Sequence, residues 1–545
     1  TVPMQLNGFD AKWLVAGVTL GGQRLVYSSS ELQSAQQIDG NDLILLYGRA
    51  GEPGETVLRY ASAPKVTVVE GQANSAFDAA KGDLKLDYSH QGRAVVRIEG
   101  GGRPPLTLIL ADEAEGARYW REKDMLVRGP ALVRSAVAKG GALVFTGDTN
   151  TASPLEIWAP KAVRSVSWNG AKVTTKATAI GSIAAVQPLT GPADVALPAL
   201  SDWRMAQGSP EAQPGFDDSS WQTIDNRSYA STTAKPDGQP NMLMDAYGFH
   251  DGDVWYRGRF TGSPDARALS LYYGAGGSGL VQAWVDGKFI GESETPGGLP
   301  RPITTGTARF TLPAEGQAAG EHVLSVMVRN NGHNWDLDSD DFHKEARGLV
   351  SASLEGGPSG RSFAVPIRWK IQGKQGGEDL PDVARGPANN GGLYGERMGW
   401  HLPGFNDAGW AKASVPATQA AAGTSWYRTS FALNVPKGQD ATIGLSFGDA
   451  SKPRSPVRYR VLVFVNGWNM GQFIAHVGPQ RTFPIPEGIL NHRGQNHVAL
   501  AVTSDGQPGD ALETVRLVTL RNVKGGLPVQ MVTAPNAPSD LKETK

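Results

Sequence analysis

Short apolar runs alternate with turn residues along almost the whole chain. The runs are rich in β-branched residues and bounded by Gly, Pro, Asn or Asp, as in residues 42–47 (DLILLY), 65–69 (KVTVV) and 460–465 (RVLVFV). This pattern predicts β-strands joined by tight turns. Long stretches with helical spacing are missing from the sequence, and the one short helix that we expect lies over residues 111–119. The predicted fold class is all-β.

The second part of the chain contains an internal repeat. Four landmarks recur in the same order: PGFDDSSW and PGFNDAGW at 214–221 and 403–410, WYR at 255–257 and 426–428, WVDGKFIG and VNGWNMG at 284–291 and 465–471, and GEHVLSV and QNHVALA at 320–326 and 495–501. The Asp-Gly and Asn-Gly pairs predict hairpin turns in which Gly adopts a positive φ. Two related jelly rolls explain the repeat.

These patterns divide the chain into successive β domains. We expect a strand-rich domain over residues 1–155, a small β-sandwich over 156–200, a first jelly roll over 201–375, a linker loop over 376–402, a second jelly roll over 403–534 and a polar tail over 535–545.

Composition excludes several classes of site and partner. The 545 residues include no Cys, so disulfides and cysteine-ligated metals are ruled out, and the formal net charge of −1 gives no reason to expect nucleic acid or an anionic membrane as a partner. The sequence has no apolar run of about 18 residues, the length that a membrane span requires. We expect no cofactor and no bound metal.

Several longer motifs resemble those of large multi-domain glycoside hydrolase family 35 β-galactosidases. The resemblance is carried by GPQRTFPIPEGILNHRGQN at 478–496, GGLYGERMGWH at 391–401, AYGFHDG at 246–252 and RGPALVR at 128–134. It runs from near residue 10 to near residue 520 in the family's order and covers the β domains that follow the family's catalytic barrel. The fungal members of the family use disulfides, and the absence of Cys from this chain indicates a bacterial relative.

The resemblance implies that the chemistry lies elsewhere. Family members are retaining glycosidases whose two catalytic glutamates lie in a (β/α)₈ barrel, and no position of this chain matches those glutamates. We therefore predict no catalytic residue here, and β-galactoside oligosaccharide as a partner reached through the barrel. Because the sequence opens at Thr1 without a leader, we expect a truncated or processed start. We also expect a periplasmic or extracellular bacterial protein.

The linker over 376–402 is the best candidate for a functional segment, because long loops often carry binding residues. The resemblance implies that an aromatic residue of this region contacts the leaving-group sugar, and Trp400 is the matching position. Tyr394, Glu396 and His401 are expected beside it, while Glu378, Asp379, Arg385 and Arg397 are expected to form structural salt bridges. In the alternative interpretation, Trp400 and Tyr394 only pack the linker between the domains.

Two further patterns match known ligand-binding motifs only in part. The acidic run Asp336, Asp338, Asp340 and Asp341 lacks the spacing of a calcium-binding EF-hand loop and is expected to be solvated. GAGGSG at 274–279 satisfies the dinucleotide motif but is followed by a strand pattern instead of a helix.

The sequence thus favours the non-catalytic region of a β-galactosidase that shapes the barrel's entrance. A free-standing galactose-binding protein and a structural interaction scaffold remain the alternatives.

Overall fold

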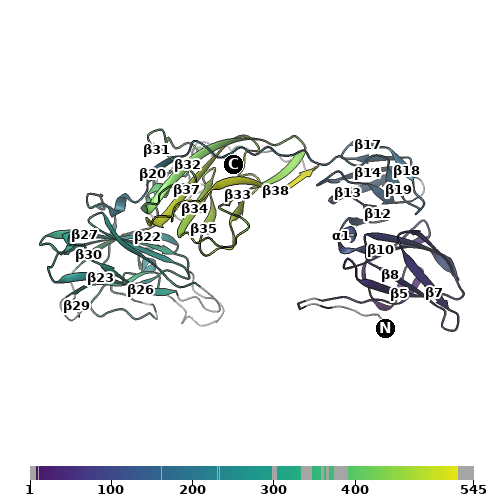
Figure 1. Cartoon of the computed structure of the whole chain (residues 1–545), viewed down its shortest axis with the longest axis horizontal. Helices are drawn as coiled ribbons and strands as arrows, with labels where there is room; N and C mark the ends of the chain where they lie inside the picture. The colour runs from purple at the N-terminus through teal and green to yellow at the C-terminus, as the bar shows by residue number, and fades with distance from the viewer. Residues whose placement is uncertain are drawn as a thin grey trace. The chain divides into compact units, whose positions relative to one another are not determined.

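The computed structural model describes residues 6, 8–9, 11–160, 163–229, 231, 233–297, 304–332, 346–356, 361–363 as backbone only, 367–373 and 391–525 (Figure 1). The all-β prediction is confirmed. Within these ranges the chain forms strands throughout and two short α-helices, α1 (Glu113–Gly116) and α2 (Tyr394–Arg397). Helix α1 lies in the segment where the sequence predicts one, and the side chain of Asp112 caps it by accepting a hydrogen bond from the Glu115 N–H.

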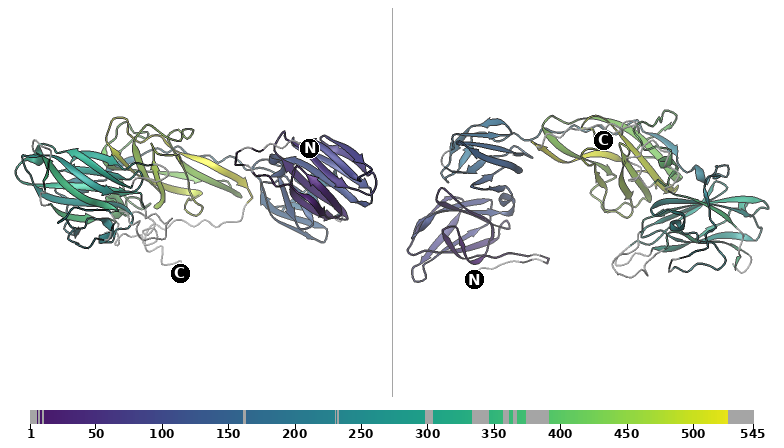
Figure 2. Two further views of the ribbon diagram at one scale, coloured as in Figure 1. Left: turned by 90° about the horizontal axis from the view of Figure 1, so that it is seen from below. Right: turned by 180° about the vertical axis from the view of Figure 1, so that it is seen from behind.

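The chain divides into two compact units. Unit 1 comprises Thr1–Val195 with Pro436–Ala441 and Arg521–Val529, and unit 2 comprises Ala196–Val435 with Thr442–Leu520 and Gln530–Lys545. Within each sandwich, two sheets lie face to face (Figure 2).

Unit 1 begins with a β-sandwich. One sheet has the order β1 (Ala16–Leu20), β2 (Gln23–Ser28), β5 (Pro53–Arg59), β8 (Asp83–Ser89) and β7 (Ala73–Asp78). The other has the order β3 (Glu31–Ile38), β4 (Asn41–Gly48), β10 (Arg103–Asp112), β9 (Arg93–Gly100) and β6 (Lys65–Glu70). Alternate residues of both sheets, such as Leu86, Val96 and Leu106, form the core between them.

A smaller sandwich completes unit 1. One sheet has the order β11 (Tyr119–Glu122), β12 (Met125–Arg128), β15 (Glu156–Trp158), β19 (Ile183–Ala185) and β18 (Thr175–Ala177). The second has the order β13 (Leu132–Lys139), β14 (Ala142–Asp148), β16 (Ser165–Trp168) and β17 (Ala171–Val173). Val127, Phe145 and Ile157 are fully buried between the sheets.

The first jelly roll of unit 2, here called roll 1, has one large and one small sheet. The large sheet has the order β21 (Gln222–Thr223), β30 (Arg368–Gln372), β22 (Gly252–Thr261), β27 (Glu321–Asn330), β24 (Leu280–Val285) and β25 (Lys288–Glu294). The small sheet has the order β26 (Thr305–Thr311), β23 (Ala266–Gly274), β28 (Gly348–Gly356) and β29 (Arg361–Phe363). Val254, Tyr256 and Val326 lie in the core between them.

The second jelly roll, roll 2, repeats this arrangement. Its large sheet has the order β31 (Ala411–Lys412), β20 (Arg204–Gln207), β32 (Ala422–Asn434), β37 (Arg493–Asp505), β34 (Tyr459–Val465) and β35 (Trp468–Ile474). Its small sheet has the order β36 (Thr482–Pro484), β33 (Gln439–Phe447) and β38 (Val515–Lys524). Strand β20 precedes roll 1 in sequence but pairs with β31 and β32 of roll 2, so the two rolls are interleaved in the chain.

Each roll contains an equivalent hairpin, and its turn has the conformation predicted from the sequence. Gly287 and Gly467 both have φ of 82°, and the preceding Asp286 and Asn466 both have φ of 49°. Positive φ at both central residues makes the twist of the turn match that of the flanking strands.

The two rolls contact each other through the outer faces of their large sheets. The side chain of Gln282 on β24 donates a hydrogen bond to the carbonyl of Ser504 on β37 at 2.9 Å. Glu294 on β25 accepts a hydrogen bond from His476 at 2.8 Å and from Arg460 on β34. Because these groups are largely buried, the contact joins the rolls into one unit.

Candidate functional site

The described part of the predicted linker, residues 391–402, packs against both rolls. Arg397 on α2 forms an ion pair with the fully buried Glu211 and donates a hydrogen bond to the Gly392 carbonyl at 2.6 Å. Burial raises the pKa of Glu211, and the nearby Arg397 opposes that shift. Glu378, Asp379 and Arg385, predicted to form salt bridges here, lie outside the described residues, as does the acidic run from Asp336 to Asp341.

Trp400 lies in a cluster of aromatic rings. Its ring centroid is 5.0 Å from that of Trp410, 5.6 Å from Tyr394 and 6.0 Å from Trp426. Trp426 is completely buried, whereas Trp400 and Tyr394 remain partly exposed. The cluster therefore fixes the Trp400 ring while leaving part of its side chain at the surface.

A buried arginine holds the loop that follows Trp400. Arg428, the arginine of the second WYR motif, donates hydrogen bonds to the carbonyls of Trp400 and Leu402, the latter at 3.1 Å. Its Nε donates to Asp407 at 2.9 Å, and its guanidinium lies 5.4 Å from the centre of the Phe405 ring. These bonds satisfy carbonyls of an irregular segment that has no strand partner.

Roll 1 contains an equivalent arginine contact. Arg257, the arginine of the first WYR motif, donates Nε to Asp218 at 2.8 Å and Nη1 to the Gln213 carbonyl at 3.0 Å, with its guanidinium 5.5 Å from the Phe216 ring centre. The Asp of each FxD motif (Phe216 to Asp218 in roll 1, Phe405 to Asp407 in roll 2) thus bonds to the Arg of the following WYR motif. This buried contact is made once in each roll.

Glu396 is a fully buried carboxyl group. One oxygen accepts a hydrogen bond from the Leu393 N–H at 3.2 Å, and the other has no partner among the described residues. Burial raises the pKa of Glu396 to about 7, the charge of Asp253 adds to that rise, and Arg329 opposes it. Asp253 in turn accepts two hydrogen bonds from Arg329, at 2.7 and 3.0 Å.

This arrangement does not form a hydrolytic pair. A retaining glycosidase needs two carboxyl groups that both reach the sugar. Glu396 and Asp253 are each 0% exposed, so neither reaches a bound sugar in this structure. His401, predicted beside Trp400, is also buried and lies 5.1 Å, centre to centre, from the Phe464 ring. Trp400 and Tyr394 therefore lie in contact with each other, whereas the side chains of Glu396 and His401 are buried.

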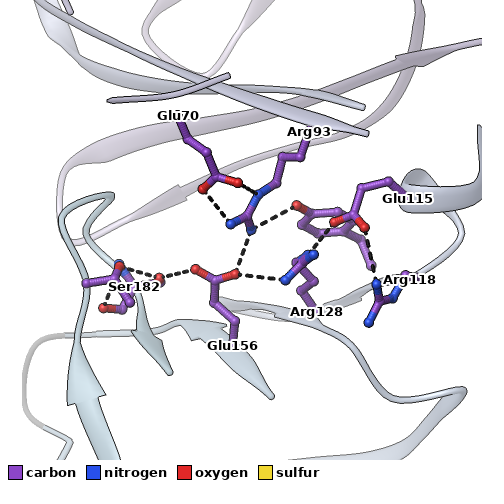
Figure 3. A network of polar contacts seen from close by, with 9 residues as sticks. Glu70, Arg93, Glu115, Arg118, Arg128, Glu156 and Ser182 are labelled. Atoms are coloured by element: carbon purple, nitrogen blue, oxygen red, sulfur yellow. Dashed lines mark hydrogen bonds and ion pairs between the residues drawn. The ribbon is translucent and has the colours of Figure 1, made fainter. Parts of the chain in front are cut away.

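Unit 1 contains a polar network that sequence analysis does not indicate (Figure 3). Glu156 on β15 pairs with Arg93 on β9 at 2.6 Å and with Arg128 on β12 at 3.4 Å, and it accepts a hydrogen bond from Ser182 at 2.6 Å. Arg93 also pairs with Glu70 at 2.6 Å. Because Arg93 belongs to the first sandwich and Glu156 to the smaller one, the network fastens the two together.

Three protein-family models match the chain. They are described as "Beta-galactosidase, domain 2" over residues 1–119, "Beta-galactosidase, domain 3" over residues 107–184, and "Beta-galactosidase second all-beta domain" over residues 216–334 and 394–508. This chain consists largely of β-galactosidase domains. Domain 2 corresponds to the first sandwich, domain 3 to the smaller one, and the second all-beta domain matches both jelly rolls, which the internal repeat explains.

Relatives of these β-galactosidase domains occur in fungi. The chain is 33% identical over 533 residues to probable beta-galactosidase B of Aspergillus fumigatus, covering 94% of this chain and 50% of that protein. It is 34% identical over 519 residues to probable beta-galactosidase B of Sclerotinia sclerotiorum, covering 91% and 49%. The chain thus spans about half the length of the curated relatives it matches.

Solved structures align with the chain only weakly. A glycosyl hydrolase family 2 member from Bacteroides cellulosilyticus aligns with a TM-score of 0.17 and 10% identity, covering 59% of this chain and 35% of that one. An alignment of this quality carries no argument about function.

The described residues contain no candidate metal cluster and no candidate membrane-spanning helix. No cluster of three or more His, Asp or Glu side chains there could hold a metal ion. Across the same ranges, no helix is long and apolar enough to cross a bilayer.

Proposed function

We propose that this chain is the non-catalytic β region of a retaining family 35 β-galactosidase, which removes terminal β-D-galactose from oligosaccharides. The observation that carries the proposal is the order of the matches: domain 2, domain 3 and the second all-beta domain follow one another along a chain that spans half the length of the β-galactosidases it resembles. The catalytic glutamates would belong to a barrel outside the matched half.

The proposed role of the region is to position the substrate. Its domains would line the entrance of the barrel, and the linker would present Trp400, supported by Tyr394, to the leaving-group sugar. The partly exposed Trp400 ring, held by neighbouring rings, supports this role, because a fixed aromatic face suits the C–H face of a sugar. Orientation of the substrate by such a surface raises kcat/KM. The periplasmic or extracellular location and the oligosaccharide partner stay predictions.

A complementation experiment tests the proposal. The catalytic barrel of a relative is expressed separately and assayed on lactose with and without this chain. The proposal predicts that adding the chain raises kcat/KM on lactose. Unchanged activity, together with no association of the two polypeptides by sedimentation, would contradict it.

A further inference from the structure

The segment that carries Tyr394 and Trp400, residues 393–402, contains one fully buried acid, Glu396. Three backbone hydrogen bonds fold the segment, from the N–H groups of Arg397, Met398 and Trp400 to the carbonyls of Leu393, Tyr394 and Gly395, at 3.1, 2.9 and 2.7 Å. Glu396 lies in the short helix α2 and is 0% exposed. A change in its charge therefore acts inside the segment that carries the two rings.

The charged groups beside Glu396 are paired with one another. Asp253 on β22 accepts two hydrogen bonds from Arg329 on β27, at 2.7 and 3.0 Å. Arg397 on α2 forms an ion pair with the buried Glu211. Each pair is neutral as a whole, so an ionised Glu396 adds one uncompensated negative charge to a buried cluster.

The other charged or titratable side chains near the segment are Arg257 on β22, Arg428 on β32 and His401. The Nε atom of Arg257 donates a hydrogen bond to Asp218 at 2.8 Å. The Nε atom of Arg428 donates one to Asp407 at 2.9 Å. Both arginines are thus committed to carboxylates outside the segment. His401 is buried within the segment and is the competing titratable group that an experiment has to separate from the acid.

The surroundings of the Glu396 carboxyl group favour its neutral form. One oxygen accepts a hydrogen bond from the Leu393 N–H at 3.2 Å, and the other oxygen has no partner among the described residues. A buried carboxylate needs several donors to offset the loss of water. Burial and the charge of Asp253 accordingly raise the pKa of Glu396 to about 7, although the Leu393 N–H and Arg329 oppose that shift.

Exposing Glu396 to water does not require either roll to unfold. None of residues 393–402 belongs to a strand, and α2 is a single turn of four residues. Opening the segment therefore breaks the contacts of one turn and leaves the sheets intact. Short elements outside the sheets are the parts of a folded protein that open locally at low free-energy cost.

We propose that Glu396 is a proton-dependent switch: with Glu396 neutral, residues 393–402 stay packed against both rolls, and its ionisation favours local opening of this segment. Opening would separate Tyr394 and Trp400 from the ring cluster that fixes them. The inference rests on the proposed function for the role of Trp400 toward a sugar, and it adds that this role is favoured at acidic pH. The opening itself involves this chain alone.

Amide hydrogen exchange of the whole chain tests the proposal. Protection is measured by mass spectrometry at a series of pH values from 5 to 8, after correction for the intrinsic exchange rate at each pH. In the wild type, residues 393–402 should be less protected than β22 at every pH, because they open locally. Their protection should fall by about tenfold per pH unit between about pH 5 and 7 and then level off, because the closed segment holds a proton that the open segment releases in that range.

Two variants remove the titration. Glu396→Gln keeps an acceptor for the Leu393 N–H, and Glu396→Met replaces the carboxyl group by an apolar chain of similar length. Both should abolish the pH dependence of protection in residues 393–402, while protected amides in β22 show that each variant is folded. Glu321→Gln is the matched control, because it makes the same change at a side chain that is 56% exposed, and the pH dependence should remain.

Three results would overturn the proposal. Protection of residues 393–402 that does not change with pH would show that there is no switch. A pH dependence that persists in both Glu396 variants would assign the titration to another group, such as His401. Protection as high as that of β22 at every pH would mean that the segment opens only when roll 1 unfolds. Because the measurement involves neither a sugar nor a barrel, its outcome is independent of the complementation experiment.

Discussion

Arg428 lies buried beneath the loop that carries Trp400 and donates its Nε hydrogen bond to Asp407 at 2.9 Å. Arg257 and Asp218 make the equivalent contact in roll 1 at 2.8 Å. In both rolls, one guanidinium therefore satisfies the carbonyls of an irregular segment and neutralises the carboxylate of the FxD turn. The stability of each roll should depend on it.

Arg428→Ala is expected to destabilise unit 2 by about 3–5 kcal/mol, because it leaves a partly buried carboxylate and several carbonyls without their donor. Arg428→Lys should lose part of that amount, since an ammonium group cannot span the same acceptors. The midpoint of urea unfolding, followed by Trp fluorescence, measures the effect. Arg368→Ala is the matched control, because its side chain is 78% exposed, and that midpoint should not move. Equal midpoints for all four proteins would refute this role of Arg428.

Glu396 should make stability depend on pH. Its pKa is about 7 in the folded state against 4.5 for an unperturbed Glu. A raised folded-state pKa means that the stabilising effect of its proton is complete below pH 4.5 and is lost as the pH rises through about 7. A difference of 2.5 pKa units corresponds to roughly 3 kcal/mol.

Glu396→Gln keeps an acceptor for the Leu393 N–H and removes the titration. The variant should be more stable than the wild type at pH 8, and its advantage should shrink steadily as the pH falls toward 4.5. Urea midpoints at a series of pH values measure this. Parallel pH profiles for the two proteins would show that Glu396 does not carry the effect.

Glu156 should fasten the two sandwiches of unit 1. Glu156→Ala leaves Arg93 and Arg128 without a shared carboxylate in a largely buried setting, and a loss of about 3–5 kcal/mol is expected. Amide hydrogen exchange should increase first in β15 and β12. Lys81→Ala, which breaks an exposed ion pair with Asp78, is the control and should leave exchange in β15 and β12 unchanged. Retained protection in the Glu156 variant would argue against a fastening role.

Trp400→Ala, made in a full-length enzyme, should lower kcat/KM about tenfold on galacto-oligosaccharides and much less on a nitrophenyl β-galactoside. Only the longer substrates offer a leaving-group sugar for the ring to contact. Trp13→Ala, which removes an exposed Trp of unit 1, is the control. A similar loss on both substrate classes would indicate that Trp400 serves packing alone.

Local patterns in the sequence predicted much of the fold. The alternation of apolar residues predicted the strands. The Asp286-Gly and Asn466-Gly pairs predicted the hairpin turns, and the repeated WYR motif indicated two related rolls. These features depend on the spacing of apolar residues and on the residue types at turns. Both are determined by residues that are neighbours in the sequence.

Other features depend on contacts between distant residues and were not predictable. Strand β20 joins the sheet of roll 2 because of its partners on β31 and β32, which no local pattern marks. The same holds for Glu156, whose arginines come from β9 and β12. Glu396 and His401 were expected beside Trp400 at the leaving-group subsite, and the structure buries both side chains.

Hydrolysis by the chain alone distinguishes a non-catalytic region from a complete enzyme. Purified chain is incubated with nitrophenyl β-D-galactopyranoside, and release of nitrophenol is compared with that from a heat-denatured sample. We expect no turnover above the denatured control, because the carboxyl groups that perform the reaction are proposed to belong to the barrel. Turnover above that control, abolished by substitution of a carboxyl residue of this chain, would show that the chain itself holds the catalytic carboxyl groups.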